Sequence, residues 1–170
     1  MTMKVYLATD HVGFELKNKL KTFLSKKGYE IEDCGASEYN KDDDYPDFIS
    51  KAAEAVSEDP NARGIVFGGS GQGEAMLANK FKNVRCNLFY ALVAPNQAAD
   101  ITGRTSNDPY EIIRLTREHN DANMLSIGVR FVKEEDVFKA VEMWLETKFT
   151  GEERHKRRIE KVKKIEEMYV

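Results

Sequence analysis

Apolar and polar positions follow two different periodicities along this chain. Five short runs are apolar or alternate strictly, as β-strands do, and they cover 4–9, 29–34, 64–67, 86–93 and 123–129. Between and after these runs, apolar residues recur every three or four positions, as on the buried face of a helix. The helices expected from this pattern cover 16–24, 49–56, 74–80, 110–117, 137–145 and 152–168. Strands and helices are thus predicted to alternate.

Alternating strands and helices form parallel sheets, because each right-handed crossover returns the chain to the same edge. We therefore expect an α/β fold, a three-layer αβα sandwich of the Rossmann or flavodoxin-like type with a five-stranded, mainly parallel sheet. No repeat or low-complexity linker interrupts the chain, so residues 1–170 are expected to form a single domain. Ligands of such sheets bind beyond the carboxyl ends of the strands. Asp10, His11 and the loop 68–73 are expected at that edge.

Composition narrows the class of protein. With 170 residues, 41% hydrophobic and 32% charged, the chain has the size and mix of one soluble globular domain. Its formal charge of −3 argues against a protein that coats nucleic acid or anionic lipid. No run of 18 apolar residues occurs and a strand-like segment starts at Lys4, so we expect no membrane span, no signal peptide and a cytoplasmic location. Cys34 and Cys86 are too few for a disulfide scaffold or a metal cage, and we expect buried, reduced thiols.

The loop after the third expected strand is rich in glycine. It reads Gly-Gly-Ser-Gly-Gln-Gly over 68–73, so its backbone N–H groups could converge on an anion without obstruction by side chains. The spacing is neither that of a P-loop nor that of a dinucleotide-binding loop, and a tight turn alone would also explain the glycines. Glu74 follows at a helix start, where the helix dipole by itself favours a carboxylate. A carboxylate beside oxyanion donors can also remove a proton next to a carbonyl and stabilise the enediolate.

Histidines and arginines supply the remaining candidates. His11 and His119 both fall in segments expected to be polar loops, where each could also be a surface histidine or a helix-end cap. Arg154 and Arg158 lie one turn apart on the last expected helix, and two guanidinium groups at this spacing can grip a phosphate. A solvated helix whose arginines are balanced by nearby glutamates is the alternative.

Taken in order, these motifs resemble those of the ribose-5-phosphate isomerase B family, which also includes galactose-6-phosphate and allose-6-phosphate isomerases. The resemblance covers nearly the whole chain. It rests on the segments 10–14, 44–46, 69–73, 78–80, 117–123 and 154–158. Several motifs in a fixed order are stronger evidence than any one of them alone.

The resemblance implies an aldose–ketose isomerisation of a phosphorylated sugar without a metal or other cofactor. His119 would assist the opening of the furanose ring, with Asp10 as the partner group near the ring and anomeric oxygens. Ser70 and the backbone amides around Gly71 and Gly73 would hold the enediolate oxygen while a base moves a proton between C1 and C2.

Phosphate binding and assembly are implied in the same way. His11, Arg154 and Arg158 match phosphate-binding positions, Arg130 is a weaker addition, and Asn120 resembles a contact to a sugar hydroxyl. The family builds each site from two chains. A homodimer, or a dimer of dimers, that shares its sites between chains is therefore expected.

The chain departs from the common family pattern in two places. Many relatives carry a catalytic cysteine at the end of the third strand, where this chain has Gly68. Another branch uses a glutamate, which matches Glu74 and makes it the expected base, so Cys34 and Cys86 should be dispensable. An insertion around 94–108 precedes His119, and it could form a lid, extend the dimer interface or reshape the sugar pocket.

The preferred substrate stays open at this point. Ribose 5-phosphate, converted to ribulose 5-phosphate, is the first choice, and allose or galactose 6-phosphate is the alternative within the same chemistry. A non-catalytic phosphosugar sensor would need the phosphate grip but no base, so the joint presence of Asp10, Glu74 and His119 favours an enzyme. Binding of nucleic acid by the basic last helix is the weakest hypothesis.

Overall fold

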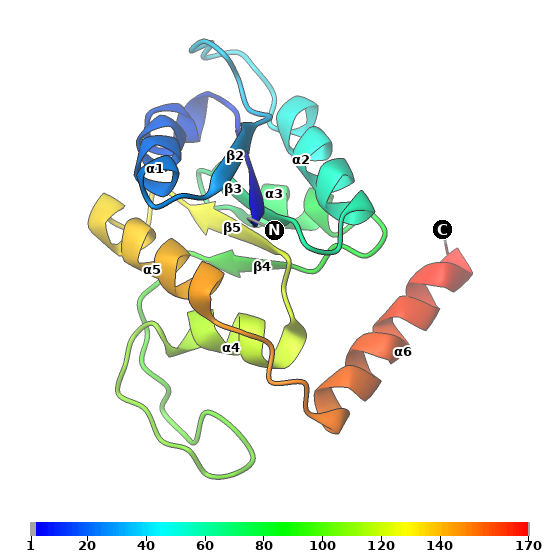
Figure 1. The fold of residues 1–170 in the computed structure, drawn as a ribbon. Helices are drawn as coiled ribbons and strands as arrows, with labels where there is room; N and C mark the ends of the chain where they lie inside the picture. The colour runs from blue at the N-terminus through cyan, green and yellow to red at the C-terminus, as the bar shows by residue number, and fades with distance from the viewer. Residues whose placement is uncertain (1–2, 170) are drawn as a thin grey trace. The chain divides into compact units, whose positions relative to one another are not determined.

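The structure is a computed structural model that describes residues 3–169, and its strands and helices alternate as the sequence pattern predicts (Figure 1). The strands are β1 (Lys4–Thr9), β2 (Glu30–Asp33), β3 (Arg63–Gly68), β4 (Cys86–Phe89) and β5 (Met124–Gly128). The helices are α1 (Phe14–Lys26), α2 (Pro46–Glu58), α3 (Gln72–Ala78), α4 (Glu111–Asn120), α5 (Glu134–Glu146) and α6 (Glu153–Tyr169). A short 3₁₀ turn, η1 (His11–Gly13), links β1 to α1.

All five strands form one parallel sheet with the order β2-β1-β3-β5-β4. The predicted flavodoxin-like α/β sandwich is therefore confirmed. The last strand of the chain, β5, lies between β3 and β4. Thr9 is in register with Phe67, and Gly68 with Gly128, so β1, β3 and β5 end side by side. The loops after these three strands consequently meet at one edge of the sheet.

Helices cover both faces of this sheet. Successive strand residues point to opposite faces, and Tyr6 and Ala8 pack with Val66 against the buried stripe of α2 and part of α3. Figure 1 shows α1 on the other side of the sheet, where its Leu20 and Leu24 are fully buried. These contacts give the first of two compact units, which comprises the chain up to Tyr90 and Ala122–Phe138.

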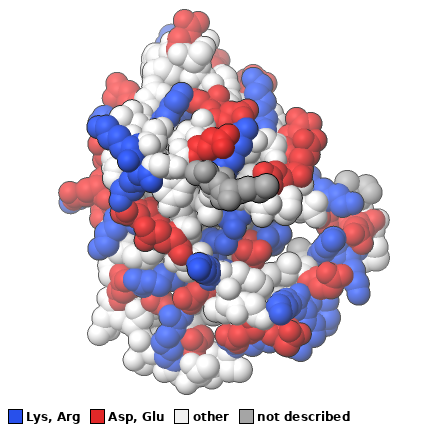
Figure 2. Space-filling view, viewed as in Figure 1, with Lys and Arg blue, Asp and Glu red and all other residues white. Residues whose placement is uncertain are grey.

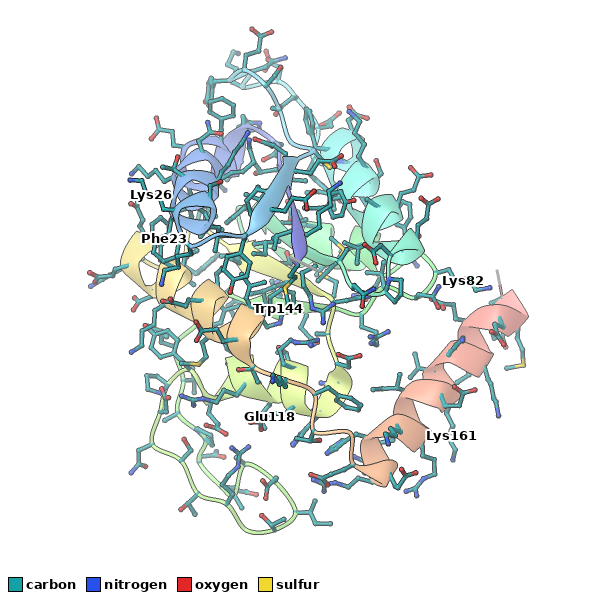
Figure 3. The ribbon with its side chains drawn as sticks, in the orientation of Figure 1. Phe23, Lys26, Lys82, Glu118, Trp144 and Lys161 are labelled. Atoms are coloured by element: carbon teal, nitrogen blue, oxygen red, sulfur yellow. The ribbon has the colours of Figure 1, made fainter. Side chains whose placement is uncertain are left out.

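Aromatic packing ties α1 to the start of α5 within this first unit. The rings of Phe23 and Phe138 lie 5.0 Å apart between centroids, and Phe23 is labelled in Figure 3. Gly28 follows α1 with a φ of 87°, a left-handed conformation that glycine adopts without steric cost. Gly28 thus follows the last residues of α1 and terminates the helix.

The second unit comprises Ala91–Asp121 and the chain from Lys139 onward. Its α4 packs on the later part of α5 around Trp144, which is fully buried and labelled in Figure 3. The Arg117 guanidinium lies 5.8 Å from the centre of the Trp144 ring, and its Nε donates to the Thr147 carbonyl at 3.3 Å. Charge and aromatic contact therefore fix the end of α4 on α5.

The segment 90–110 contains neither helix nor strand, and it includes the expected insertion. Arg104 holds it to α4: its Nη2 lies 2.8 Å from Glu118 Oε2 and 3.0 Å from Glu111 Oε1. The same guanidinium pairs with Asp100 at 3.0 Å. These ion pairs give a long loop the fixed contacts that a solvated loop lacks.

The fourth strand is shorter than expected, and the apolar stripe of α6 is exposed. The expected strand 86–93 ends at Phe89, since its pairing with β5 stops at Ile127 and residues 90–93 have no strand partner in the described chain. The apolar stripe of α6 is present, but Val162 and Ile165 are 61% and 53% exposed in the described chain.

Charge is mixed on the surface. Figure 2 shows Lys and Arg intermingled with Asp and Glu over the face in view. Of the helices among residues 3–169, none combines the length and apolar character needed to cross a membrane.

Candidate functional site

The glycine-rich loop after β3 has a conformation that its neighbours fix. Gly71 has a φ of 74°, and a Cβ there would lie 2.7 Å from Leu88 Cδ1 and 3.0 Å from the Gly128 nitrogen. Only glycine fits this position without strain. The Ser126 hydroxyl donates to the Gly71 carbonyl at 2.6 Å, and the Ala75 N–H donates to it at 3.1 Å. The loop is therefore held from β5 on one side and from α3 on the other.

Two other members of the loop lie close to neighbouring polar side chains. Ser70 is half-buried, and its hydroxyl oxygen accepts a long hydrogen bond of 3.4 Å from the Gln72 N–H. A Cβ added at Gly73 would lie 2.9 Å from the Tyr45 hydroxyl, so the phenol closely approaches the backbone here. The helix that follows starts at Gln72, two residues earlier than expected.

Glu74 carries the carboxylate nearest this loop. Its side chain folds back over Gly68, so that a Cβ at residue 68 would overlap the carboxyl group. Glu74 is only 6% exposed. Burial raises the pKa of Glu74 above its ordinary value, and the negative charge of Asp10 raises it further. The space that a side chain at residue 68 would fill thus holds a buried carboxyl group with increased proton affinity.

Asp10 lies at the end of β1, next to this carboxyl group. It is buried, and its Oδ1 accepts a hydrogen bond of 2.9 Å from the Val12 N–H, which caps η1. Thr9 connects the same turn to β3, because its hydroxyl donates to the Phe67 carbonyl at 3.0 Å and accepts from the Gly13 N–H at 3.1 Å. The position of Asp10 relative to the loop is therefore set by hydrogen bonds as well as by the sheet.

His11 follows Asp10 and pairs with Asp43, which is not among the expected site residues. Its Nδ1 lies 2.7 Å from Asp43 Oδ1, which also accepts from the His11 backbone N–H at 2.9 Å. The hydrogen bond to Asp43 raises the pKa of His11, against the opposing effect of burial, and the charge of Asp10 adds to the increase. The run of three aspartates at 42–44 was the available signal, but spacing alone does not show which of them turns inward.

A cleft of about 560 Å³ adjoins His11. Arg130, from the loop after β5, lines the same cleft, and its guanidinium carbon would lie 3.3 Å from a Cβ at Gly69. The structure thus brings Asp10, His11 and Arg130 to the edge of the sheet where the glycine-rich loop and Glu74 lie.

Asp10, His11 and Asp43 are a group of three potential metal ligands in the described chain. The 2.7 Å between His11 Nδ1 and Asp43 Oδ1 is a hydrogen-bond distance. Two atoms bound to one zinc ion at about 2.0–2.2 Å in tetrahedral geometry lie farther apart than this. The geometry fits a proton shared by the two groups and does not fit a metal ion between them.

The second unit holds the other histidines. His119 lies in the last turn of α4, so its expected position in a loop is wrong. The helix extends to Asn120, because the Asp121 N–H still donates to the carbonyl groups of Thr116 and Arg117. The His119 ring stacks on His155 of α6, with centroids 4.2 Å apart and an angle of 15° between planes. His155 is buried, and this burial lowers its pKa, with a further decrease from the charges of His119 and Arg154.

The remaining predicted residues of the second unit are Asn120, Arg154 and Arg158. Arg154 and Arg158 both belong to α6, and Arg154 Nε is 2.8 Å from Glu152 Oε2. Asn120 is the exposed last residue of α4. The predicted site residues therefore form two groups, one in each compact unit.

Neither cysteine has the properties of a nucleophile or base. Burial raises the pKa of Cys34 to about 11 and that of Cys86 to about 12, so both are neutral thiols at physiological pH. Both are free thiols; Cys86 is buried as expected, whereas Cys34 is only half-buried. Cys34 lies just after β2 and not inside it, whereas Cys86 begins β4.

Comparison with known proteins identifies consistent similarities. The sequence model of the Ribose/Galactose Isomerase family matches residues 5–108 and 91–162. The chain is 38% identical over 158 residues to ribose-5-phosphate isomerase B of Mycolicibacterium paratuberculosis, covering 93% of this chain and 88% of that protein.

Solved structures agree with this result. Ribose-5-phosphate isomerase B of Clostridium thermocellum superposes with a TM-score of 0.83 and 37% identity, covering 99% of this chain and 100% of that one. The enzyme of Mycoplasma genitalium, solved with bound ribulose-5-phosphate, superposes with a TM-score of 0.84 and 31% identity over 98% of each chain.

Proposed function

Since the chain belongs to the ribose/galactose isomerase family and is an aldose–ketose phosphate isomerase, we propose that it converts ribose 5-phosphate to ribulose 5-phosphate without a metal ion. The substrate is supported by the relatives described above, one of which binds ribulose-5-phosphate. The chemistry requires a base that moves a proton between C1 and C2 and donors that stabilise the enediolate.

The position of Glu74 carries the proposal for the base. Its carboxyl group fills the space above Gly68, where many relatives would place a cysteine side chain. Burial raises its pKa toward neutrality, which suits a group that must both take up and return a proton. Ser70 and the amides around Gly71 and Gly73 hold the enediolate oxygen in this scheme.

The other groups act before proton transfer. His119 opens the furanose ring with Asp10, and its contact with His155 supports a fixed ring orientation. His11, Arg130, Arg154 and Arg158 bind the phosphate, and Asn120 binds a sugar hydroxyl. His11 and Arg130 line one cleft, which supports their joint role.

We further propose that the protein is a homodimer, or a dimer of dimers, whose sites are shared between chains. The exposed apolar side chains Val162, Ile165 and Met168 on α6 support a covered surface in the assembly. The ion pairs of Arg104 favour a fixed extension of the structure over a mobile lid for the segment 94–108. A single domain over residues 1–170 and a cytoplasmic location stay predictions.

Two alternatives follow from specific features. The segment 94–108 precedes α4, which carries His119, so it could adapt the pocket to allose or galactose 6-phosphate. A phosphosugar sensor would need no buried carboxyl group with a raised pKa, and Glu74 therefore favours the enzyme.

Glu74→Gln tests the base. We expect kcat for ribose 5-phosphate to fall by about 10³-fold with KM nearly unchanged, because a general base typically contributes about 10²–10⁴-fold. In the unchanged protein, kcat should rise with pH through a pKa above the ordinary 4.5 of a glutamate. Glu54→Gln, which alters an exposed carboxylate on α2, is the control.

Assays with ribose, allose and galactose phosphates rank the substrates. Near-normal turnover by the Glu74→Gln protein would contradict the assignment of the base. Absence of turnover with all three sugars would contradict the proposed function itself.

A further inference from the structure

The middle aspartate of the run 42–44 is not a surface residue like its neighbour. The Asp43 side chain is 9% exposed, whereas the Asp42 side chain is 75% exposed and pairs with the exposed Lys41. Asp43 Oδ1 accepts two hydrogen bonds, and both come from His11. The contact spans 32 positions in sequence, so it is made by the fold and not by local turn geometry.

We propose that Asp43 is a positioning residue for phosphate binding: it holds the His11 ring by Nδ1 and keeps it cationic, so that Nε2 donates to the substrate phosphate. This inference rests on the proposed function, in which His11 contacts the phosphate. It adds a residue that itself touches no substrate atom.

Proton placement on the imidazole explains why a carboxylate is needed. When Nδ1–H donates to Asp43, Nε2 carries a hydrogen only if the ring is doubly protonated. A phosphate oxygen is an acceptor, so a neutral ring with its hydrogen on Nδ1 would present a lone pair to it. The negative charge of Asp43 favours the doubly protonated ring, which has a donor on each nitrogen.

The burial of Asp43 supports the same conclusion. Its Oδ2 atom is buried and has no hydrogen-bond partner among residues 3–169. A buried carboxylate with half of its acceptors unused is costly unless a cation lies beside it. The charged His11 ring is that cation, so each group stabilises the charged form of the other.

Other titratable groups line the cleft around His11. Tyr39 contacts the ring edge-on, with centroids 6.2 Å apart. Lys19 and Glu134 are 2.7 Å apart and largely compensate each other. The titratable and charged groups that surround His11 are Asp10, Glu15, Lys19, Tyr39, Asp43, Arg130 and Glu134. In Asp43→Asn, the charge of Asp10 still favours the protonated His11 ring. We therefore expect the His11 pKa to fall in this variant, but to stay above the pKa of a buried histidine without a charged partner.

Asp43→Asn tests the inference, because asparagine keeps the shape and the acceptor oxygen but removes the charge. Asp42→Asn is the matched control on the adjacent residue. The chain has three histidines, so the His11 signals can be assigned in a two-dimensional NMR titration by comparison with a His11→Asn protein. We expect the His11 pKa to fall by about one unit in Asp43→Asn, which is a tenfold change in proton affinity.

Inorganic phosphate serves as the binding probe, measured by calorimetry at pH 7.5. We expect Asp43→Asn to weaken phosphate binding about tenfold, to raise KM for ribose 5-phosphate by a similar factor and to change kcat less than twofold. The alkaline loss of phosphate affinity should move to lower pH, since the affinity is lost as pH rises through the His11 pKa. Asp42→Asn should leave all four quantities unchanged.

The inference is overturned if a folded Asp43→Asn protein, with a circular-dichroism melt like that of the unchanged protein, keeps either the His11 pKa or the phosphate affinity. If Asp43→Asn does not fold, the unchanged protein decides: a His11 pKa at or below the ordinary 6.5 overturns the inference. If no sugar phosphate is turned over, the proposed function fails, while the phosphate and NMR titrations still decide the role of Asp43.

Discussion

Replacement of Gly68 by alanine would place a methyl group where the Glu74 carboxyl group now lies. Gly68 is not among the glycines with positive φ, so its backbone accepts alanine. The atoms in the way are the end of a flexible glutamate side chain and not backbone. The carboxyl group should therefore move aside while β3 and the glycine-rich loop stay in place.

The expected magnitudes follow from this geometry. Normal contact with the new methyl group requires the carboxyl group to move on the order of 1 Å or more, and such a displacement of a reacting group costs about 10²-fold in rate. Overpacking of a rigid core costs about 1–3 kcal/mol. Since Glu74 can rotate, we expect a loss of stability below about 1 kcal/mol, equivalent to about 2–4 °C in Tm or less.

The assay compares kcat for ribose 5-phosphate with Tm in four proteins: unchanged, Gly68→Ala, Glu74→Gln and the double variant. If both changes act on one carboxyl group, the double variant should be no slower than Glu74→Gln alone. A Gly68→Ala protein with normal kcat would refute the idea that the empty space at residue 68 positions the base. A large loss of Tm with retained kcat would show that the backbone, and not Glu74, moves.

Two further predictions concern the second unit. Arg158→Ala should raise KM about tenfold and leave kcat within twofold, because it removes a charge-assisted contact to phosphate. An unchanged KM in a steady-state assay would mark Arg158 as an ordinary surface residue. Arg104→Ala should lower stability by about 1 kcal/mol, since the guanidinium is partly exposed but joins Asp100, Glu111 and Glu118, and amide exchange of 99–104 should accelerate. Lys41→Ala, which removes a largely exposed ion pair, is the control, and equal melting curves for both variants would contradict the role of Arg104.

Local pattern was sufficient for most of the secondary structure. The strand 4–9, for example, depends on nearby residues and lies where expected. The fourth strand was predicted too long, because a strand needs a paired neighbour, and pairing with β5 stops at Phe89 and Ile127 despite the apolar character of residues 90–93. The end of α4 was missed for a related reason: polar residues 117–120 resemble a loop, but their turn is completed by helix hydrogen bonds and packing on α5.

The candidate site likewise has features that the sequence predicts and features that only the fold shows. Residues 68–74 predict a glycine-rich loop followed by a carboxylate, and Gly68 excludes a catalytic cysteine at the end of the third strand. Only the fold shows that the Glu74 carboxyl group occupies the space above Gly68. Asp43 could not be selected from three consecutive aspartates, since its burial and its pairing with His11 depend on a contact between distant segments.

The sequence by itself determined the alternation of strands and helices, the residue types of the site and the motifs that resemble one isomerase family. These properties depend on periodicity and on short segments, which neighbouring residues specify. The tertiary structure decided the insertion of β5 between β3 and β4, the raised pKa of Glu74 and the partner of His11. Strand order, desolvation and long-range hydrogen bonds arise only when distant segments pack together, so no local pattern contains them.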